Sequence, residues 1–259
     1  MLSVIIPSYK DPYLHKTIDS ILENATGEIE IIPVLDGYWP DTPIKDNPRI
    51  NVVHVGRNRG MRGAINTGVK LAKGEYIMRT DEHCMFAKGF DEAITSVIKP
   101  NEIMTATRYF LDPKEWKVMD LPPYIYEKLK IRDGKFEGQR WPSRDKERAA
   151  IMVDETMAMQ GSFWIMPKKW WDEVIGELQI DGYGPLIQDS HEMVFKTWKA
   201  GGRLMVNKNT WFAHKHYSFT RTHNQGTEEN PANNAAGYKY CIDVWGDYYE
   251  NEIRPKWGV

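Results

Sequence analysis

The sequence predicts an α/β fold built on a mostly parallel central sheet flanked by helices. Over the first hundred residues, apolar β-rich runs alternate with segments of helical spacing, and the links between them are short. Such alternation is typical of sheets wound with right-handed crossovers. The first run ends in Pro7-Ser8-Tyr9-Lys10, which is neither a GxGxxG fingerprint nor a Walker loop. We therefore expect a nucleotide-binding type of sheet without either common phosphate loop.

Each element in the first half has its own local signal. Leu14, Ile18 and Ile21 share one face of a helix, and Lys73-Gly74 ends a second helix. In chain order the predicted elements are the strand Ser3–Pro7, the helix Leu14–Leu22, the strands Glu30–Leu35 and Ile50–Val55, the helix Gly63–Ala72, the strand Glu75–Arg79 and the helix Phe90–Ile98.

Residues 110–150 differ in character from what precedes them. Pro and Gly interrupt the segment, and charges are dense from Lys128 to Arg148. We expect an irregular excursion over the sheet, of the kind that often forms a binding loop. The elements predicted after it are the strand Thr156–Met166, the helices Trp170–Ile175 and Gln188–Ala200, the strands Arg203–Val206 and Thr210–Ala213, an Asn/Pro/Gly-rich stretch Gln225–Gly237 and a helix-like segment Tyr238–Tyr249.

Composition limits the classes of protein to consider. The 259 residues suit one large domain or a domain with an extension, and 41% hydrophobic with 27% charged residues is ordinary for a soluble globular protein. A net charge of -2 gives no support to a polyanion-binding surface. Two cysteines without a CxxC pair favour a reducing compartment, and we expect a cytoplasmic protein. No apolar run is long enough to predict a membrane span, and the N-terminus does not resemble a signal peptide.

The motif Asp81-Glu82-His83 follows the predicted strand Glu75–Arg79 directly. In an extended segment, residues 81 and 83 point to the same side, so a carboxylate and an imidazole are presented together at a strand end. Open α/β sheets bind their ligands at such ends, and this pair is a sensible half-site for a divalent metal such as Mn²⁺. The alternative is a polar strand end whose Asp81 caps the next turn.

Several further motifs occur in a fixed order along the chain. They are Ser3-Val4-Ile5-Ile6-Pro7-Ser8-Tyr9, Glu30-Ile31-Ile32-Pro33-Val34-Leu35-Asp36-Gly37, Asn58-Arg59-Gly60, Asp81-Glu82-His83, Gly161-Ser162-Phe163-Trp164, Asp189, Gly201-Gly202 and Ala213-His214. This order resembles the family 2 glycosyltransferases and their GT-A relatives, although Leu35 stands where that family usually has Asp. The Asp-x-His motif, followed by Cys84, is similar to that of the polypeptide N-acetylgalactosaminyltransferases. The resemblance covers residues 1 to about 217.

The resemblance implies a GT-A type, Rossmann-like fold with an acceptor-side excursion and a C-terminal extension. Residues 1–217 would form the glycosyltransferase domain. Within it, residues 1–108 would be the nucleotide-sugar-binding half and residues 109–217 the acceptor-side half. Residues 218–259 would be the extension.

The resemblance also implies a metal site for Mn²⁺ or Mg²⁺. Asp81 and His83 would supply two ligands and His214 a third. Two imidazoles and one carboxylate leave coordination positions open for phosphate oxygens and water. His216 is a competitor for the third position because it faces the same way as His214 in an extended segment.

Donor binding is assigned by the same resemblance. Pro7, Ser8 and Tyr9 would line the base pocket, and Thr80 and Asp81 would lie beside it. The carboxylate of Asp36 would accept a hydrogen bond from the base or ribose, although Asp36-Gly37 is also a plain turn signal. The two remaining candidates, Arg62 and Asn66, flank the same crevice, but most arginines on such helices are simply solvated.

Asp189 is the candidate catalytic base. It occupies the position of the acidic residue that, in inverting family 2 enzymes, takes the proton of the acceptor. Asp189 can equally cap the following helix, with Glu192 completing a capping-box-like start. The Asp-x-His motif resembles that of retaining transferases, in which Asp189 would instead bind sugar hydroxyls. Inversion is slightly favoured.

The predicted function is metal-dependent transfer of a sugar from a nucleotide-sugar donor, expected to be UDP-linked, to a hydroxyl acceptor. The acceptor stays open between a saccharide, a protein side chain and a hydroxymethylated DNA base. Two alternatives are a nucleotidyltransferase of similar sheet and a non-catalytic sugar-binding module. The former would be expected to show a Gly-rich basic loop after the first strand, which this sequence lacks.

Overall fold

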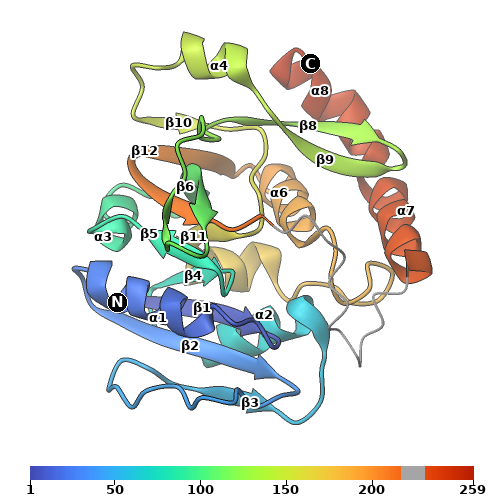
Figure 1. The fold of residues 1–259 in the computed structure, drawn as a ribbon. Helices are drawn as coiled ribbons and strands as arrows, with labels where there is room; N and C mark the ends of the chain where they lie inside the picture. The colour runs from blue at the N-terminus through green and yellow to red at the C-terminus, as the bar shows by residue number, and fades with distance from the viewer. Residues whose placement is uncertain (217–230) are drawn as a thin grey trace.

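The computed structural model describes residues 1–216 and 231–259, which form a twisted sheet with helices on both faces (Figure 1). The sheet has the strand order β10-β12-β6-β11-β4-β1-β2-β3, with β5 on β12 and β7 on β6. Its strands are β1 (Leu2–Ser8), β2 (Ile29–Asp36), β3 (Val53–Val55), β4 (Tyr76–Thr80), β5 (Cys84–Phe86), β6 (Glu102–Asp112), β7 (Lys117–Val118), β10 (Val153–Glu155), β11 (Phe163–Pro167) and β12 (Arg203–His214). A separate hairpin consists of β8 (Glu127–Arg132) and β9 (Lys135–Arg140).

Most strands of the sheet run in one direction. β3, β2, β1 and β4 are parallel neighbours, β6 and β12 are parallel to each other, and β11 lies antiparallel between the two groups. Every residue of β1 and β2 is buried, as expected for parallel strands covered on both faces. The predicted fold class is confirmed.

The helices divide between the two faces. One core cluster joins Ile5 and Val34 of the sheet to Val69 and Phe195, and the other joins Val4 to Ile18 and Phe90. The helical elements are α1 (Leu14–Asn24), α2 (Gly60–Leu71), α3 (Phe90–Thr95), α4 (Pro142–Glu147), α5 (Lys168–Trp170), the π-helix η1 (Trp171–Ile175), α6 (Asp189–Lys199), α7 (Pro231–Tyr248), the π-helix η2 (Tyr249–Ile253) and α8 (Arg254–Trp257).

The strand order reverses at β1. The chain leaves β1 toward β2 on one side and returns to β4 on the other. In open α/β sheets the crevice outside the carboxyl ends of the strands at such a reversal is the usual ligand site. The segments that follow Ser8 of β1 and Thr80 of β4 border this crevice.

Two parts of the fold differ from the expectation. Residues 110–150 contain the β8–β9 hairpin, whose turn Asp133-Gly134 has positive φ at both residues (49° and 74°). An Asp-Gly pair between two segments of alternating apolar and polar residues indicates a hairpin, so this hairpin could have been predicted from the sequence. The strands expected at Arg203–Val206 and Thr210–Ala213 are one strand, β12, with a register shift between Asn207 and Trp211.

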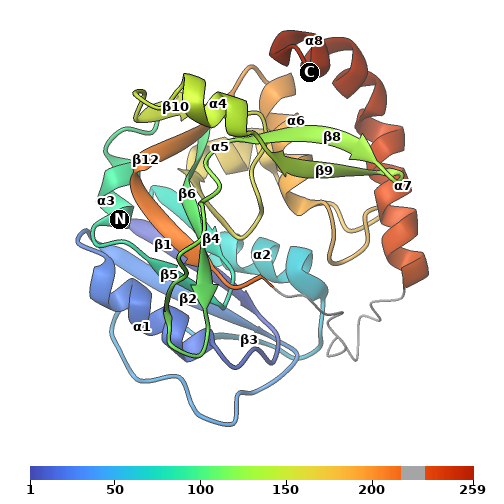
Figure 2. The same ribbon diagram turned by 45° about the horizontal axis from the view of Figure 1, so that its top comes forward.

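The C-terminal helices pack on the same core as the rest of the chain (Figure 2). Trp245 of α7 stacks on Phe195 of α6 with ring centroids 5.3 Å apart, and Tyr249 donates a hydrogen bond of 2.7 Å to the carbonyl of Leu129. The expected boundary between residues 217 and 218, and the first part of the stretch Gln225–Gly237, lie outside the described residues. Within residues 1–216 and 231–259, no helix has the length and apolar character needed to cross a bilayer.

Candidate metal and nucleotide site

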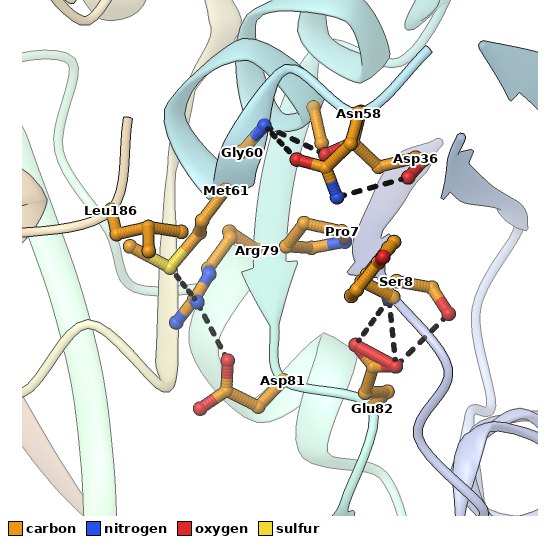
Figure 3. Close-up of a pocket in the computed structure, with 12 residues that line it drawn as sticks. Pro7, Ser8, Asp36, Asn58, Gly60, Met61, Arg79, Asp81, Glu82 and Leu186 are labelled. Carbon is orange, nitrogen blue, oxygen red and sulfur yellow. Dashed lines mark hydrogen bonds and ion pairs between the residues drawn. The ribbon is translucent and has the colours of Figure 1, made fainter. Parts of the chain in front are cut away.

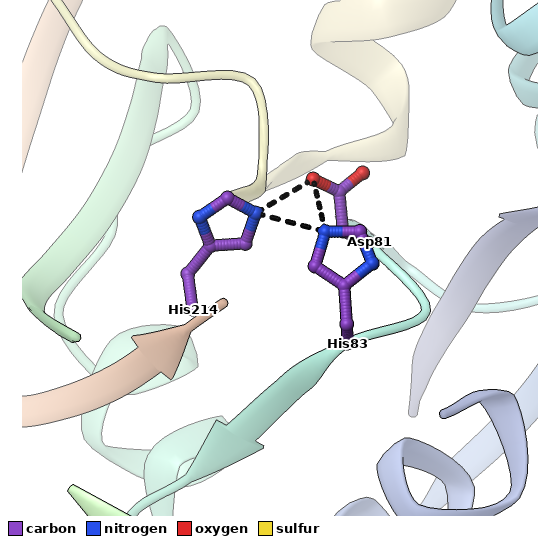
Figure 4. A group of neighbouring side chains, drawn as sticks. All are labelled: Asp81, His83 and His214. Atoms are coloured by element: carbon purple, nitrogen blue, oxygen red, sulfur yellow. Dashed lines mark hydrogen bonds and ion pairs between the residues drawn. The ribbon is translucent and has the colours of Figure 1, made fainter. Parts of the chain in front are cut away.

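The strand register brings three metal-ligating side chains together. Asp81 and His83 follow β4, and β12 pairs antiparallel with β5 so that His214 lies opposite Cys84. One ligand atom from each of Asp81, His83 and His214 lies within 4.8 Å of the others (Figure 4). These three residues are called the triad below.

The spacing within the triad suits one face of an octahedral metal site. The His83 and His214 Nε2 atoms are 3.1 Å apart, and Asp81 Oδ2 lies 3.1 Å from His214 Nε2 and 3.6 Å from His83 Nε2. Adjacent ligands of an octahedral ion with bonds of about 2.1 Å are about 3.0 Å apart. Three ligands on one face leave the other positions open to phosphate oxygens and water. The residues present therefore fit a divalent ion such as Mn²⁺.

Two neighbouring groups orient the triad. His83 Nδ1 is 3.0 Å from Asp11 Oδ2, which fixes the ring so that Nε2 faces the triad. Arg79 donates to Asp81 Oδ1 at 2.6 Å, which leaves Oδ2 for the histidines. Asp11 could not be predicted from the sequence, because no spacing rule connects it to a histidine 72 positions away.

The electrostatics of the triad favour its ligand-competent protonation states. Burial alone would raise the pKa of Asp81, but the guanidinium of Arg79 and the hydrogen bond to His214 hold this pKa well below its usual range. Burial lowers the pKa of His214 to about 3. An ionised carboxylate and a neutral imidazole are the forms that bind a metal.

Glu82, between the two ligands, faces the first strand instead. Its carboxylate accepts hydrogen bonds from the Ser8 hydroxyl at 3.0 Å and from the backbone N–H groups of Tyr9 and Asp11 at 3.1 and 3.2 Å. These bonds hold the loop after β1 and so position Asp11 behind His83. No role for Glu82 was predicted from the sequence.

A pocket adjoins the triad at the strand-order reversal (Figure 3). Five residues predicted for donor binding line it: Pro7, Ser8, Tyr9, Asp36 and Asp81. Seven further residues complete the lining: Asn58, Gly60, Met61, Ala64, Arg79, Glu82 and Leu186. This set is called the nucleotide pocket below.

Asp36 is already bound to the protein on both oxygens. They accept hydrogen bonds from the backbone N–H groups of Arg59 (2.8 Å) and Gly60 (2.7 Å), which lie at the start of α2. Burial raises the pKa of Asp36 despite these donors. Gly60 has φ of +76°, and a Cβ there would lie 2.4 Å from Pro185 Cβ, so the chain requires glycine at this turn. The predicted contact of Asp36 with base or ribose stays a prediction.

Arg62, Asn66 and Thr80 are not among the residues that line this pocket. The fully buried Arg62 forms an ion pair with Glu192 and donates to the carbonyls of Ile187 and Gln179. The side chain of Asn66 bonds both the N–H and the carbonyl of Leu178. These bonds therefore secure the segment 178–187, which carries Leu186 into the pocket.

Thr80 and His216 both have contacts within the protein. The buried Thr80 hydroxyl donates to the Asp81 carbonyl at 3.2 Å. The His216 ring meets the His214 ring edge-on, with centroids 4.8 Å apart, and is not part of the triad.

Asp189 is the first residue of α6 and is buried beside Gly161. Its Oδ2 has no hydrogen-bond partner within the described parts of the chain. The alternative of a capping box with Glu192 is not what the structure shows, since the Glu192 carboxylate pairs with Arg62 and Lys196. Asp189 thus has one carboxylate oxygen that is buried and forms no hydrogen bond with the described residues.

The model of the family described as "Glycosyl transferase family 2" matches residues 3–174. The chain belongs to glycosyl transferase family 2. The resemblance found in the motifs is thereby confirmed.

Individual relatives of this family 2 chain are distant. It is 33% identical to the uncharacterized glycosyltransferase EpsJ of Bacillus subtilis over 40% of this chain and 32% of that protein. It is 23% identical to the putative polypeptide N-acetylgalactosaminyltransferase 13 of Drosophila melanogaster, over 98% of this chain and 50% of the relative. The chain therefore spans half or less of the length of these curated relatives.

Among solved structures, the chain is similar to the crystal structure of GalNAc-T7 with UDP, GalNAc and Mn²⁺. The TM-score is 0.76 at 17% identity, over 98% of this chain and 50% of that one. At this identity the likeness establishes the GT-A fold alone.

Proposed function

We propose that this protein is a metal-dependent glycosyltransferase that moves a sugar from a UDP-sugar to a hydroxyl acceptor. The observation that carries the proposal is the triad at the mouth of the nucleotide pocket, with Asp81 belonging to both. Membership of family 2 and the UDP and Mn²⁺ in the GalNAc-T7 crystal structure support it.

The chemistry of sugar transfer suits this arrangement. Negative charge grows on the nucleoside diphosphate as its bond to the sugar breaks, and a divalent ion held by Asp81, His83 and His214 would stabilise that charge as a Lewis acid. In the proposal, Pro7, Ser8 and Tyr9 bind the nucleoside on the other side of Asp81. Arg79 and Asp11 keep the ligands oriented.

We propose direct displacement with Asp189 as the base. The acceptor hydroxyl gives its proton to the Asp189 carboxylate while its oxygen bonds to the anomeric carbon, and the sugar–phosphate bond breaks to release UDP. The unpartnered Oδ2 of Asp189 supports this role. The anomeric configuration of the product, determined by NMR, tests it, since a product with retained configuration rules out Asp189 as the displacement base.

The central experiment is a donor screen. The protein is mixed with Mn²⁺ and a panel of nucleotide sugars, and free UDP is measured together with UDP binding by calorimetry. We expect Mn²⁺-dependent release of UDP from at least one UDP-sugar and Mn²⁺-dependent UDP binding. The absence of both turnover with any donor and Mn²⁺-dependent UDP binding would overturn the proposed function.

A further inference from the structure

The loop of residues 178–187 lies between η1 and α6 and shapes one wall of the nucleotide pocket. Its Leu186 lines the pocket together with Arg79, and Figure 3 shows these two side chains on the side opposite Ser8. Arg79 bonds the triad residue Asp81 at 2.6 Å, so this wall adjoins the triad. The position of Leu186 therefore affects how the pocket holds the part of a donor that lies nearest the triad.

This loop has little regular structure of its own. Residues 178–187, which the structure describes throughout, form neither helix nor strand. Gly182 and Gly184 have φ of 86° and 76°, a left-handed conformation that favours glycine. Because no helix or sheet hydrogen bonds fix the shape of such a segment, its conformation depends on the elements that pack around it.

Helix α7 contacts the loop through hydrogen bonds and close backbone packing. Trp245 Nε1 donates a buried hydrogen bond of 2.7 Å to the Tyr183 hydroxyl, and Gln179 Nε2 donates one of 2.7 Å to the Tyr240 hydroxyl. Gly237 lies against the loop backbone, because a Cβ there would be 2.2 Å from the Tyr183 carbonyl oxygen. Any side chain larger than that of glycine at this position must therefore move the loop or the helix.

Tyr183 connects these contacts of α7 to helix α2. Its ring faces the Arg62 guanidinium, whose central carbon is 4.2 Å from the ring centroid. Arg62 in turn donates to the carbonyl of Ile187, the residue that follows Leu186. Packed side chains thus run without a gap from the C-terminal helix to the backbone beside Leu186.

The triad is held by other parts of the chain. Its residues follow β4 or end β12, and the groups that orient them are Asp11, after β1, and Arg79, in β4. None of the α7 contacts named above includes a triad residue. A shift of the loop should therefore change the nucleotide pocket and leave the metal ligands in place.

We propose that α7 positions the donor by holding the loop 178–187, with Tyr183 as the positioning residue that acts through Leu186. This inference rests on the proposed function, because Leu186 affects the donor only if the nucleotide pocket binds a UDP-sugar. Helix α7 then contributes to donor affinity as well as to the core.

Gly237→Ala, in the full chain, is the main test. The added methyl should push the Tyr183 carbonyl away from α7, although alanine by itself favours the helix more than glycine does. With Mn²⁺ present, the Kd for UDP by calorimetry should rise on the order of tenfold. The Kd for Mn²⁺ alone, from its paramagnetic resonance signal, should stay unchanged.

Gly246→Ala is the matched control on the same helix. Its Cβ would lie 3.5 Å from Ile242 Cγ2, which is an ordinary contact. This variant should bind both UDP and Mn²⁺ as the unaltered protein does. An effect of Gly246→Ala on UDP as large as that of Gly237→Ala would overturn the inference.

A double-mutant cycle shows whether the effect passes through Leu186. Leu186→Ala should itself weaken UDP binding, because one wall of the pocket is lost. In the Leu186→Ala protein, Gly237→Ala should weaken UDP binding much less than it does in the unaltered chain, since both changes act on one contact. A contact that only stabilised the fold would give additive effects, and additivity would overturn the positioning role.

Tyr240→Phe replaces Gly237→Ala if the latter shows no cooperative melting transition. It removes only the hydroxyl to which Gln179 donates, and it should raise the Kd for UDP by about two- to tenfold. Unchanged UDP affinity in the variant that folds, or an equal loss of Mn²⁺ affinity, would overturn the inference.

The unaltered protein separates this inference from the proposed function. If it shows no Mn²⁺-dependent UDP binding before any substitution, the proposed function fails. If it binds UDP and the α7 variants bind equally well, only the role of α7 fails.

Discussion

The Nε2 atoms of His83 and His214 lie 3.1 Å apart, although 131 positions separate the two residues in the chain. The pairing of β5 with β12 produces this contact, since it places His214 opposite the segment that carries His83. Both nitrogens face Asp81 Oδ2, and the spacing is that of adjacent ligands on one metal ion.

Replacement of His214 by alanine should abolish most metal-dependent UDP binding. One ligand of the triad is lost, so the effect should exceed the roughly 10–100-fold that loss of an orienting group costs. The measurement is the Kd for UDP with and without Mn²⁺, by calorimetry. His216→Ala is the matched control and should keep the affinity. The reverse result would make His216 the ligand.

Asp11→Asn should weaken Mn²⁺ binding by about 10–100-fold, because the charged partner of His83 Nδ1 is lost. The Kd for Mn²⁺, measured by its own paramagnetic resonance signal, reports the effect. Asp41→Asn, at an exposed position, is the control. Equal affinity in the Asp11 and Asp41 variants would show that Asp11 does not act on the metal site.

Gly161→Ala should slow catalysis without changing the affinity for UDP. A Cβ there would lie 2.8 Å from Asp189 Oδ2, so the carboxylate must move. Displacement of a catalytic group by about 1 Å can cost on the order of 100-fold in rate. We expect a lower kcat with an unchanged Kd for UDP and Mn²⁺. Gly56→Ala, whose Cβ would meet nothing within 4 Å, is the control. An unchanged kcat in the Gly161 variant would argue against Asp189 as the base.

Arg62→Met should destabilise the fold by about 3–5 kcal/mol, because it leaves Glu192 buried without its main partner. The measurement is the free energy of unfolding in urea. The double variant Arg62→Met with Glu192→Met should recover much of the loss. A single variant as stable as the unaltered protein would show that the pair contributes nothing.

The free energy of unfolding should fall as the pH drops from about 7 toward 4. Burial lowers the pKa of His191 to about 4, whereas an unfolded histidine titrates near 6.5. Between these values the unfolded chain binds more protons than the folded one, so acid favours unfolding. His191→Phe should show a smaller difference in urea unfolding between pH 7.5 and pH 5. An equal difference in the variant and the unaltered protein would show that His191 does not cause the loss of stability in acid.

Local patterns in the sequence predicted the features that depend on residues close together in the chain, such as the type of each element and the side to which its residues point. The period of two in an extended chain placed Asp81 and His83 on one side, and the structure joins both to one cluster. The alternation of strands and helices predicted the sheet, and the order of motifs pointed to His214. The Asp133-Gly134 turn was equally local, and its hairpin was missed because the charged residues around it suggested irregular structure.

Tertiary structure decided every relationship that spans distant segments. Asp11 supports His83, Glu82 holds the loop after β1, and Arg62 pairs with Glu192 across 130 positions. The resemblance made Arg62 a candidate for donor binding, with a solvated side chain as the alternative. The fold buries Arg62 against the segment that carries Leu186, and its contact with the donor stays a prediction. Side-chain periodicity determines which way a residue points within its own element. Which partner it meets depends on the packing of the whole sheet, and no local rule encodes that packing.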